Sequence, residues 1–302
     1  MASALNPPLP APIQYSAPGY RRCSYHLIRD GTLTMAKISL LGIPHDDNSS
    51  FIKGAAEAPA HIRRELHSDA YSMWSETGID LGAAGRLVDH GDIGFDAGGD
   101  PWDLIERDVG RAMEPGDPLI CLGGDHAISY PILRAVRRRH PSLTILHIDA
   151  HPDIYHAYQG NPRSHTSPFA RIMEERLADR LIQVGLRTIN NHHREQFKRF
   201  GVEVIEAGRF SESLRLDFTT PVYISMDLDG LDPAFAPGVS HREPGGLSTR
   251  QVINLIQTVN QPIVAADIVE YNPRCDTSNL TAVVAAKLFK EIAGMMMKTA
   301  SH

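Results

Sequence analysis

From Ile38 onward, short and mostly apolar runs alternate with helix-like segments along this 302-residue chain. Residues 143–148 and 221–226 are two such runs, and each is rich in residues that favour strands. Apolar runs of this kind are typical of strands that are covered by helices on both faces of a parallel sheet. Strands that alternate with helices indicate an α/β protein. The sequence therefore predicts a three-layer α/β/α sandwich with a mainly parallel sheet.

The expected elements follow one another without an evident linker. The expected strands are residues 38–43, 118–122, 143–148, 181–185, 202–205, 221–226 and 262–269. The expected helices are residues 59–66, 103–113, 128–138, 169–177, 193–200, 249–259 and 280–297. Ser248 and Gln251 have the spacing of a capping box, which predicts a helix start at this point.

The N-terminal residues differ from the rest in composition. Residues 6–12 contain four prolines and have no apolar periodicity, so we expect residues 1–34 to be a flexible, proline-rich extension. This stretch lacks the apolar centre of a secretory signal. Residues 35–302 are expected to form a single catalytic domain.

Composition limits the partners and the compartment. The formal net charge is −6, from 30 basic and 36 acidic residues, which argues against a nucleic-acid-binding protein. The longest apolar stretches fall short of the ~20 residues that a membrane span needs. The three cysteines are widely spaced, which favours a reducing compartment. We therefore expect a cytoplasmic protein without a membrane or nucleic-acid partner, with an organelle as the alternative location.

Three acidic motifs directly follow expected strands. They are Gly-Gly-Asp-His at 123–126, Asp-Ala-His-Pro-Asp at 149–153 and Asp-Leu-Asp at 227–229. Glu270 follows a fourth strand. Ligands of open α/β sheets bind at the carboxyl ends of the strands, so these side chains should meet at one edge.

So many carboxylates in one place would repel one another unless cations neutralised them. Alternate residues of an extended segment project to the same side, as at Asp149, His151 and Asp153. A set rich in oxygen ligands, with two imidazoles and no thiolate, favours manganese over structural zinc, with magnesium, nickel or cobalt as lesser options. With Asp125, the three motifs carry five carboxylates, which exceed the needs of one ion, so two ions are expected. The candidate ligands are His126, Asp149, His151, Asp153, Asp227 and Asp229.

Each motif alone has a simpler explanation. A single aspartate after a strand is most often a cap, and a single histidine such as His126 is most often a core residue with its hydrogen bonds satisfied. Asp232 precedes a proline and is expected to be a turn residue. The three motifs at strand ends in one chain favour the metal site.

The same motifs resemble the signatures of the ureohydrolase family, the arginases and agmatinases. The third signature is the segment 225–233, Ser-Met-Asp-Leu-Asp-Gly-Leu-Asp-Pro. The likeness is strongest to plant-type arginases, at residues 48–51, 164–165, 237–241 and 270–273. It implies an arginase-like fold with two Mn²⁺ ions and a homo-oligomer, either a trimer or a hexamer.

The resemblance also implies how the ligands are shared between the ions. One ion would take His126, Asp149, Asp153 and Asp227. The other would take Asp149, His151, Asp227 and Asp229. Asp149 and Asp227 would thus bridge the two ions.

The resemblance implies hydrolysis of a small guanidino substrate. The nucleophile would be a water molecule bound to the cations, because divalent cations lower the pKa of bound water. Glu270 would pair with the guanidinium, Asp153 would relay a proton to the leaving nitrogen, and His165 would exchange that proton with solvent. Asp267 is expected to orient a ligand histidine, and His241 to lie near the pocket mouth.

The favoured reaction is L-arginine to L-ornithine and urea. The alternatives are agmatine and another ω-guanidino acid, because residues 154–161 depart from the pattern by which animal arginases hold the amino-acid end of the substrate. Two rivals belong to other classes: a single-zinc amide hydrolase, and a non-catalytic scaffold that resembles ureohydrolases.

Overall fold

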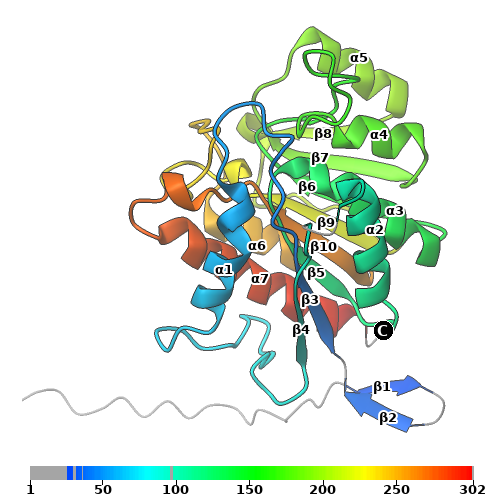
Figure 1. Ribbon diagram of the computed structural model, residues 1–302, viewed down its shortest axis with the longest axis vertical. Coiled ribbons are helices and arrows are strands. Elements are labelled where there is room, and N and C mark those ends of the chain that lie inside the picture. The colour runs from blue at the N-terminus through cyan, green and yellow to red at the C-terminus, as the bar shows by residue number, and fades with distance from the viewer. Residues whose placement is uncertain (1–25, 30–31, 36, 96–97, 301–302) are drawn as a thin grey trace, which may run out of the picture.

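The structure is a computed structural model that describes residues 26–29, 32–35, 37–95 and 98–300 (Figure 1). Its centre is an eight-stranded sheet with the strand order β4-β3-β5-β10-β9-β6-β7-β8. Every neighbouring pair in this sheet runs parallel. The predicted fold class is confirmed.

The strands of this sheet are β3 (Ile38–Gly42), β4 (Leu87–Asp92), β5 (Leu119–Leu122), β6 (Thr144–Ile148), β7 (Arg180–Leu186), β8 (Glu203–Glu206), β9 (Val222–Asp227) and β10 (Ile263–Val269). The α-helices are α1 (Ala58–Leu66), α2 (Pro101–Ala112), α3 (Ser129–Arg139), α4 (Pro168–Glu174), α5 (Asn191–Phe200), α6 (Thr249–Gln257) and α7 (Leu280–Thr299). The 3₁₀ helices are η1 (Ala55–Glu57), η2 (His126–Ile128), η3 (Ala207–Arg209), η4 (Leu228–Gly230) and η5 (Pro273–Cys275).

The N-terminal stretch contributes a separate antiparallel pair, β1 (His26–Arg29) with β2 (Thr32–Met35). Figure 1 shows this pair apart from the main sheet. The proline-rich segment 6–12 lies outside the described residues. The division at residue 34 stays a prediction.

Strand β4 is an element that the sequence patterns missed. Its sequence is Leu-Val-Asp-His-Gly-Asp, and its last four residues are exposed. It lies at one end of the sheet, so one side of its backbone has no neighbouring strand in the described part of the structure. Charged residues are common on such edge strands because they discourage pairing with other chains. A search for continuous apolar runs therefore passes over β4.

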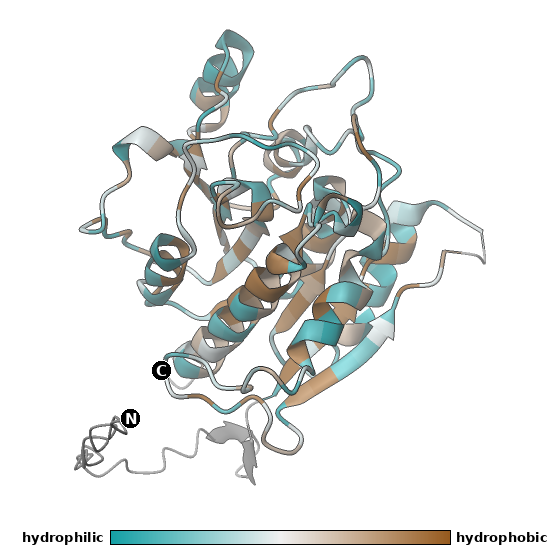
Figure 2. Ribbon diagram, turned by 90° about the vertical axis from the view of Figure 1, so that its left-hand side faces the viewer, coloured by the Kyte–Doolittle hydropathy of each residue, from teal (hydrophilic) through white to brown (hydrophobic). Residues whose placement is uncertain are grey.

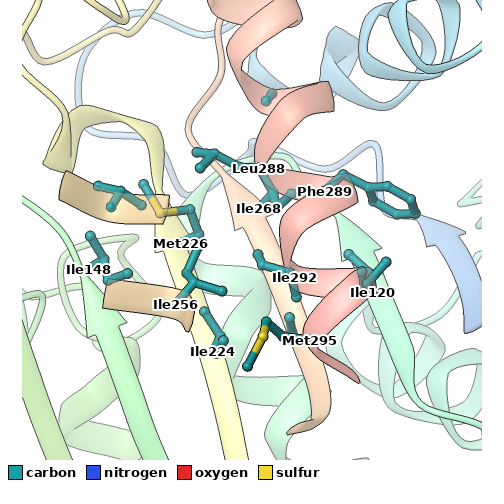
Figure 3. Packing of buried hydrophobic residues seen from close by; sticks show 14 of the residues in the cluster. Ile120, Ile148, Ile224, Met226, Ile256, Ile268, Leu288, Phe289, Ile292 and Met295 are labelled. Carbon is teal, nitrogen blue, oxygen red and sulfur yellow. The ribbon is translucent and has the colours of Figure 1, made fainter. Parts of the chain in front are cut away.

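The helices cover both faces of the sheet and enclose two apolar cores. On one face, α1, α6 and α7 pack over residues such as Ile120, Ile224 and Ile268 (Figure 3). On the other face, α2, α3 and α4 cover residues such as Ile145 and Tyr223. Figure 2 shows that the strands between these layers carry mostly hydrophobic residues. Burial of this surface stabilises the fold by roughly 25 cal/mol per Å² of apolar area.

The strand order decides where the acidic motifs meet. Strands β5, β10, β9 and β6 are consecutive neighbours at the centre of the sheet, so their carboxyl ends form one continuous edge. Two glycines let loops approach closely there. A Cβ on Gly124 would lie 1.7 Å from the His45 carbonyl oxygen, and one on Gly230 would lie 2.8 Å from the Asp149 backbone nitrogen. Both positions therefore require the smallest residue.

Two local predictions are also confirmed. Ser248 and Gln251 form the capping box at the start of α6. Asp232 directly precedes a turn and accepts a hydrogen bond from the Ala234 backbone N–H within it, and a second from the Gly245 backbone N–H of a later loop. None of the helices in the described part of the chain has the length and hydrophobicity that a membrane crossing requires.

Candidate metal centre

The six candidate ligands gather at the carboxyl edge of the central strands. Asp149 is the first residue after β6, and Asp227 is the last residue of β9. His126 begins η2, four residues after the end of β5. We call this group the carboxylate rim; it comprises His126, Asp149, His151, Asp153, Asp227 and Asp229. All but His151 are at least nine-tenths buried, and His151 is partly exposed.

His126 lies at the centre of the first cluster. Its Nδ1 is 2.9 Å from Asp153 Oδ2 and 3.1 Å from Asp227 Oδ2. It is also 3.2 Å from Asp149 Oδ2. This nitrogen is buried and has no hydrogen-bond partner among the described residues. Four ligand atoms thus converge within 4.8 Å of one another, which is the arrangement of a cation site.

The opposite nitrogen of His126 explains why Nδ1 is available. Ser225 donates its hydroxyl hydrogen to Asp267 Oδ1 at 2.7 Å. The same hydroxyl oxygen therefore accepts from His126 Nε2, at 2.9 Å. The proton of the neutral ring lies on Nε2, and Nδ1 presents a lone pair to the carboxylates. Asp267 thus acts on His126 through Ser225.

The second cluster contains Asp149, His151 and Asp229. His151 Nδ1 lies 3.0 Å from Asp229 Oδ2 and 3.6 Å from Asp149 Oδ1. Asp149 belongs to both clusters, as expected for a bridging carboxylate. Asp227 joins the first cluster but not this one, so the structure brings together three of the four ligands that we expected for the second ion.

Electrostatics shows that the rim needs positive charge. Burial raises the pKa of Asp227 well above its usual range, and the charges of Asp229 and Asp149 raise it further. Burial also raises the pKa of Asp229 to about 7, although the nearby His151 opposes this shift. Carboxylates whose ionisation is opposed by burial and by one another's charge are stabilised by a divalent cation between them.

The donor set and its geometry therefore fit metal binding. The rim supplies carboxylate oxygens and imidazole nitrogens. The buried Nδ1 of His126 faces three of those oxygens and has no hydrogen-bond partner in the part of the chain that the structure describes. Two adjoining clusters share one carboxylate, which is consistent with a binuclear site. Oxygen and imidazole ligands suit divalent transition ions of intermediate hardness.

The remaining candidate residues face the same pocket. It is lined by His151, Asp153, His165, Thr166, Asp227, Asp229, His241 and Glu270. Glu270 Oε1 accepts from the His126 backbone N–H and pairs with His165 Nδ1, both at 2.9 Å. Burial lowers the pKa of His165, but the charge of Glu270 outweighs this effect and raises it to about 9. His241 lies beside His165, with ring centroids 5.3 Å apart.

Two of these side chains sit on strained backbone. Asp153 has φ 45° and Glu270 has φ 62°, in the left-handed region that non-glycine residues seldom adopt. Such conformations cost about 1–3 kcal/mol and persist where the surrounding structure holds them. They point both carboxylates into the pocket.

The sequence patterns missed two buried polar residues behind the rim, His147 on β6 and Gln183 on β7. His147 Nε2 lies 2.8 Å from Asp149 Oδ2, and Gln183 Nε2 lies 2.9 Å from His147 Nδ1. The sequence did contain a signal for them, because His147 and Gln183 are each a polar residue within an otherwise apolar strand. His147 also precedes Asp149 by two residues, so the two side chains project to the same side of the strand.

Comparison with known proteins agrees with this geometry. A family model described as Arginase family matches residues 36–294. The chain belongs to the arginase family. Arginase 1, mitochondrial, from Arabidopsis thaliana is 48% identical over 281 residues, which cover 87% of this chain and 82% of the relative. The resemblance seen in the sequence is confirmed.

Other arginase-family members show how far the likeness extends. The solved arginase from Medicago truncatula has a TM-score of 0.82 and 45% identity, with 86% of this chain and 87% of that chain covered. An agmatinase from Bacillus anthracis is 31% identical over 268 residues, which cover 85% of this chain and 91% of the relative. The chain is thus a metal-dependent ureohydrolase of the arginase family.

Proposed function

We propose that the chain hydrolyses L-arginine to L-ornithine and urea at the carboxylate rim. The observation that carries this proposal is the pair of buried clusters that share Asp149 and open, with Glu270, into one pocket. Two relatives that are 48% and 45% identical are named arginases, which favours arginine as the substrate.

His126, Asp149, Asp153 and Asp227 would hold one cation, and Asp149, His151, Asp227 and Asp229 the other. When bound, two divalent cations supply Lewis acidity that makes water nucleophilic near neutral pH. We assign Mn²⁺ as both ions, with Ni²⁺ or Co²⁺ as further options, because the rim is rich in carboxylates and has two imidazoles.

Glu270 orients the substrate. Its two hydrogen bonds from His126 N and His165 Nδ1 both fall on Oε1. We assign Oε2 to the guanidinium, whose planar N–H groups match a carboxylate. Pairing there places the trigonal carbon over the rim, where water attacks it.

The leaving nitrogen needs a proton before the carbon–nitrogen bond breaks. Asp153 lines the pocket and would pass a proton from the attacking water to that nitrogen. His165 Nε2 lies 2.8 Å from the hydroxyl of Ser50, an exposed residue. His165 and Ser50 would therefore exchange protons with solvent. The products are urea and the protonated amine.

The test is to measure urea release from L-arginine and from agmatine by the Mn²⁺-loaded protein. We expect kcat/KM for arginine to exceed that for agmatine by at least ~10-fold, a difference of about 1.4 kcal/mol. Agmatine is the second candidate, because the Bacillus anthracis relative is named an agmatinase. A higher kcat/KM for agmatine would show that agmatine, and not arginine, is the preferred substrate.

Metal identity and stoichiometry need a separate measurement. The metal-stripped protein is reloaded with Mn²⁺, Ni²⁺, Co²⁺ or Zn²⁺, and bound ions per chain are counted. We expect two ions per chain and the highest kcat/KM with Mn²⁺. One bound ion and activity with Zn²⁺ alone would favour a single-zinc hydrolase. Metal binding without urea release from any guanidino compound would favour a non-catalytic scaffold.

Assembly and location complete the proposal. We expect a trimer or a hexamer, which light scattering on the purified chain would measure. The cytoplasmic location stays a prediction, and the mitochondrial name of the Arabidopsis relative makes an organelle its competitor. Imaging of the full chain fused to a fluorescent protein would distinguish the two.

A further inference from the structure

A row of buried polar side chains crosses the sheet one step behind the carboxylate rim. We call Gln183, His147, Ser225 and Asp267 the polar row. The strand registers align them, since His147 lies opposite both Gln183 and Ser225, and Ser225 lies opposite Asp267. All four side chains are fully buried. Buried polar groups are costly unless they are hydrogen-bonded, so this row needs a structural or functional reason.

The hydrogen bonds of Gln183 determine which ring nitrogen of His147 carries the proton. Gln183 Nε2 lies 2.7 Å from the Pro152 carbonyl oxygen, which can only accept, so this corner of the side chain is the amide nitrogen. Its second hydrogen points to His147 Nδ1, at 2.9 Å. Nδ1 must therefore be an acceptor without a proton. The proton of His147 lies on Nε2, which donates to Asp149 Oδ2 at 2.8 Å.

Ligand atoms of His147, Asp149 and His126 lie within 4.8 Å of one another, which is close enough for the three residues to bind a cation. The hydrogen bonds of His147 argue against that role, because both ring nitrogens are already engaged. His126 differs, since its Nδ1 has no hydrogen-bond partner within the described ranges of the chain. The two histidines near Asp149 thus have separate tasks: His126 faces the rim with a lone pair, and His147 faces Asp149 with a proton.

Asp149 is held from two sides. The His151 backbone N–H donates to its Oδ1 at 2.6 Å, and His147 donates to its Oδ2. Together the two donors fix the rotation of the carboxylate. Each oxygen keeps another lone pair for a cation. Phe169 packs on the His147 ring, with centroids 4.1 Å apart, and limits its movement.

We propose that Gln183 and His147 are positioning residues that orient the shared carboxylate of Asp149 for both cations. This inference rests on the proposed metal centre and adds two residues to it. Loss of His147 frees Asp149 to rotate and leaves a carboxylate oxygen without its donor. Because Asp149 belongs to both clusters, the affinity for both ions should fall.

The test compares Mn²⁺ binding to metal-stripped variants, measured by titration calorimetry and by the electron paramagnetic resonance signal of coupled Mn²⁺ pairs. We expect His147→Leu to weaken binding roughly 10–100-fold and to reduce the coupled signal. His147→Gln carries an amide N–H near the position of Nε2 and should recover most of the affinity. Gln183→Leu keeps His147 as the donor to Asp149 but no longer fixes which ring nitrogen of His147 carries the proton. We expect this variant to bind Mn²⁺ roughly 3–10-fold more weakly than the wild type.

Phe169→Leu is the matched control, because it removes packing from His147 but none of the hydrogen bonds. It should lower the melting temperature and change the Mn²⁺ dissociation constant less than threefold, a margin of about 0.6 kcal/mol. Circular dichroism verifies that each variant is folded. If His147→Leu does not fold, the Mn²⁺ affinities of Gln183→Leu and His147→Gln are compared with those of the wild type and Phe169→Leu instead.

The outcomes separate this inference from the proposed function. Normal Mn²⁺ binding by the wild type together with unchanged binding by His147→Leu would refute the positioning pair alone. Equal weakening by Phe169→Leu would also refute it, since packing would then explain the effect. A wild-type protein that binds no Mn²⁺ would overturn the metal centre and this inference together.

Discussion

Two regions of the sheet lie side by side and have opposite chemistry. Met226 and Asp227 are consecutive residues at the end of β9, and both are buried. Met226 packs in the apolar core against α6 and α7 (Figure 3). Asp227 instead joins the carboxylate rim. The core lowers the free energy of the fold by removing apolar surface from water. The rim gathers buried negative charge, which opposes folding until cations bind.

This difference predicts a separation of effects. Changes in the rim should reduce activity and leave the metal-free fold nearly as stable as before. Changes in the core should reduce stability and leave the activity of the folded protein intact. Active sites are often built at such a cost to stability.

The largest expected effect is that of Asp227→Asn. The amide oxygen can still accept from the Asp229 backbone N–H, which contacts Asp227 Oδ1 at 2.8 Å. The negative charge, however, is lost from the first cluster. We expect kcat/KM to fall roughly 10³-fold or more, because loss of a ligand exceeds the ~10–100-fold cost of losing an outer partner.

The metal-free Asp227→Asn protein should melt no lower than the metal-free wild type, because the amide cannot ionise and so never places a buried negative charge beside Asp149 and Asp229. Calorimetry in chelator measures this. A large loss of stability would show that the rim supports the fold, and full activity would remove Asp227 from the metal centre.

The next largest effect is expected in the core. Phe289 on α7 is fully buried within the apolar layer shown in Figure 3. Phe289→Ala should lower the free energy of unfolding by about 3–5 kcal/mol, from lost burial and the cavity left behind. Urea unfolding measures the loss. The folded variant should keep kcat/KM within about twofold, because no rim contact changes; a selective loss of activity would contradict the separation.

The sequence predicted the sheet and the rim for the same physical reason. Continuous apolar strands such as β6 and β9 indicate a sheet that is buried on both faces. A carboxylate directly after such a strand must lie at the carboxyl end of the strand, where ligands bind. The missed strand β4 lies at the edge of the sheet and is polar, so it has no such pattern. Whether a strand lies at the edge of a sheet depends on the order of the strands, and the residue pattern of a single segment does not reveal that order.

The polar row was harder to predict. His147 lies between Leu146 and Ile148, and a single histidine in an apolar run is most often a satisfied core residue. What distinguishes it is Gln183, which lies opposite it on the neighbouring strand and 36 residues away in the chain. Pairing across strands needs the register of the sheet, so the two residues become one unit only in the folded structure.

The smallest expected effect is a pH dependence at Asp125, which lies beside the rim. Burial, together with the charge of Glu270, raises the pKa of Asp125 from 3.8 to about 7. Its contribution to stability is therefore fully present below pH 3.8 and is lost as the pH rises through 7. Asp125→Asn does not titrate. Between pH 6 and pH 8, the metal-free wild type should lose about 1 kcal/mol of stability relative to this variant.

Urea unfolding of both proteins in chelator at the two pH values measures this difference. Phe289→Ala provides the control, because a change in the apolar core should cost the same at pH 6 and pH 8. A difference between wild type and Asp125→Asn that is the same at pH 6 and pH 8 would mean that Asp125 is already ionised at pH 6. The buried charge near the rim would then be stabilised by the protein itself, and the contrast between rim and core would depend less on bound cations than the electrostatics indicates.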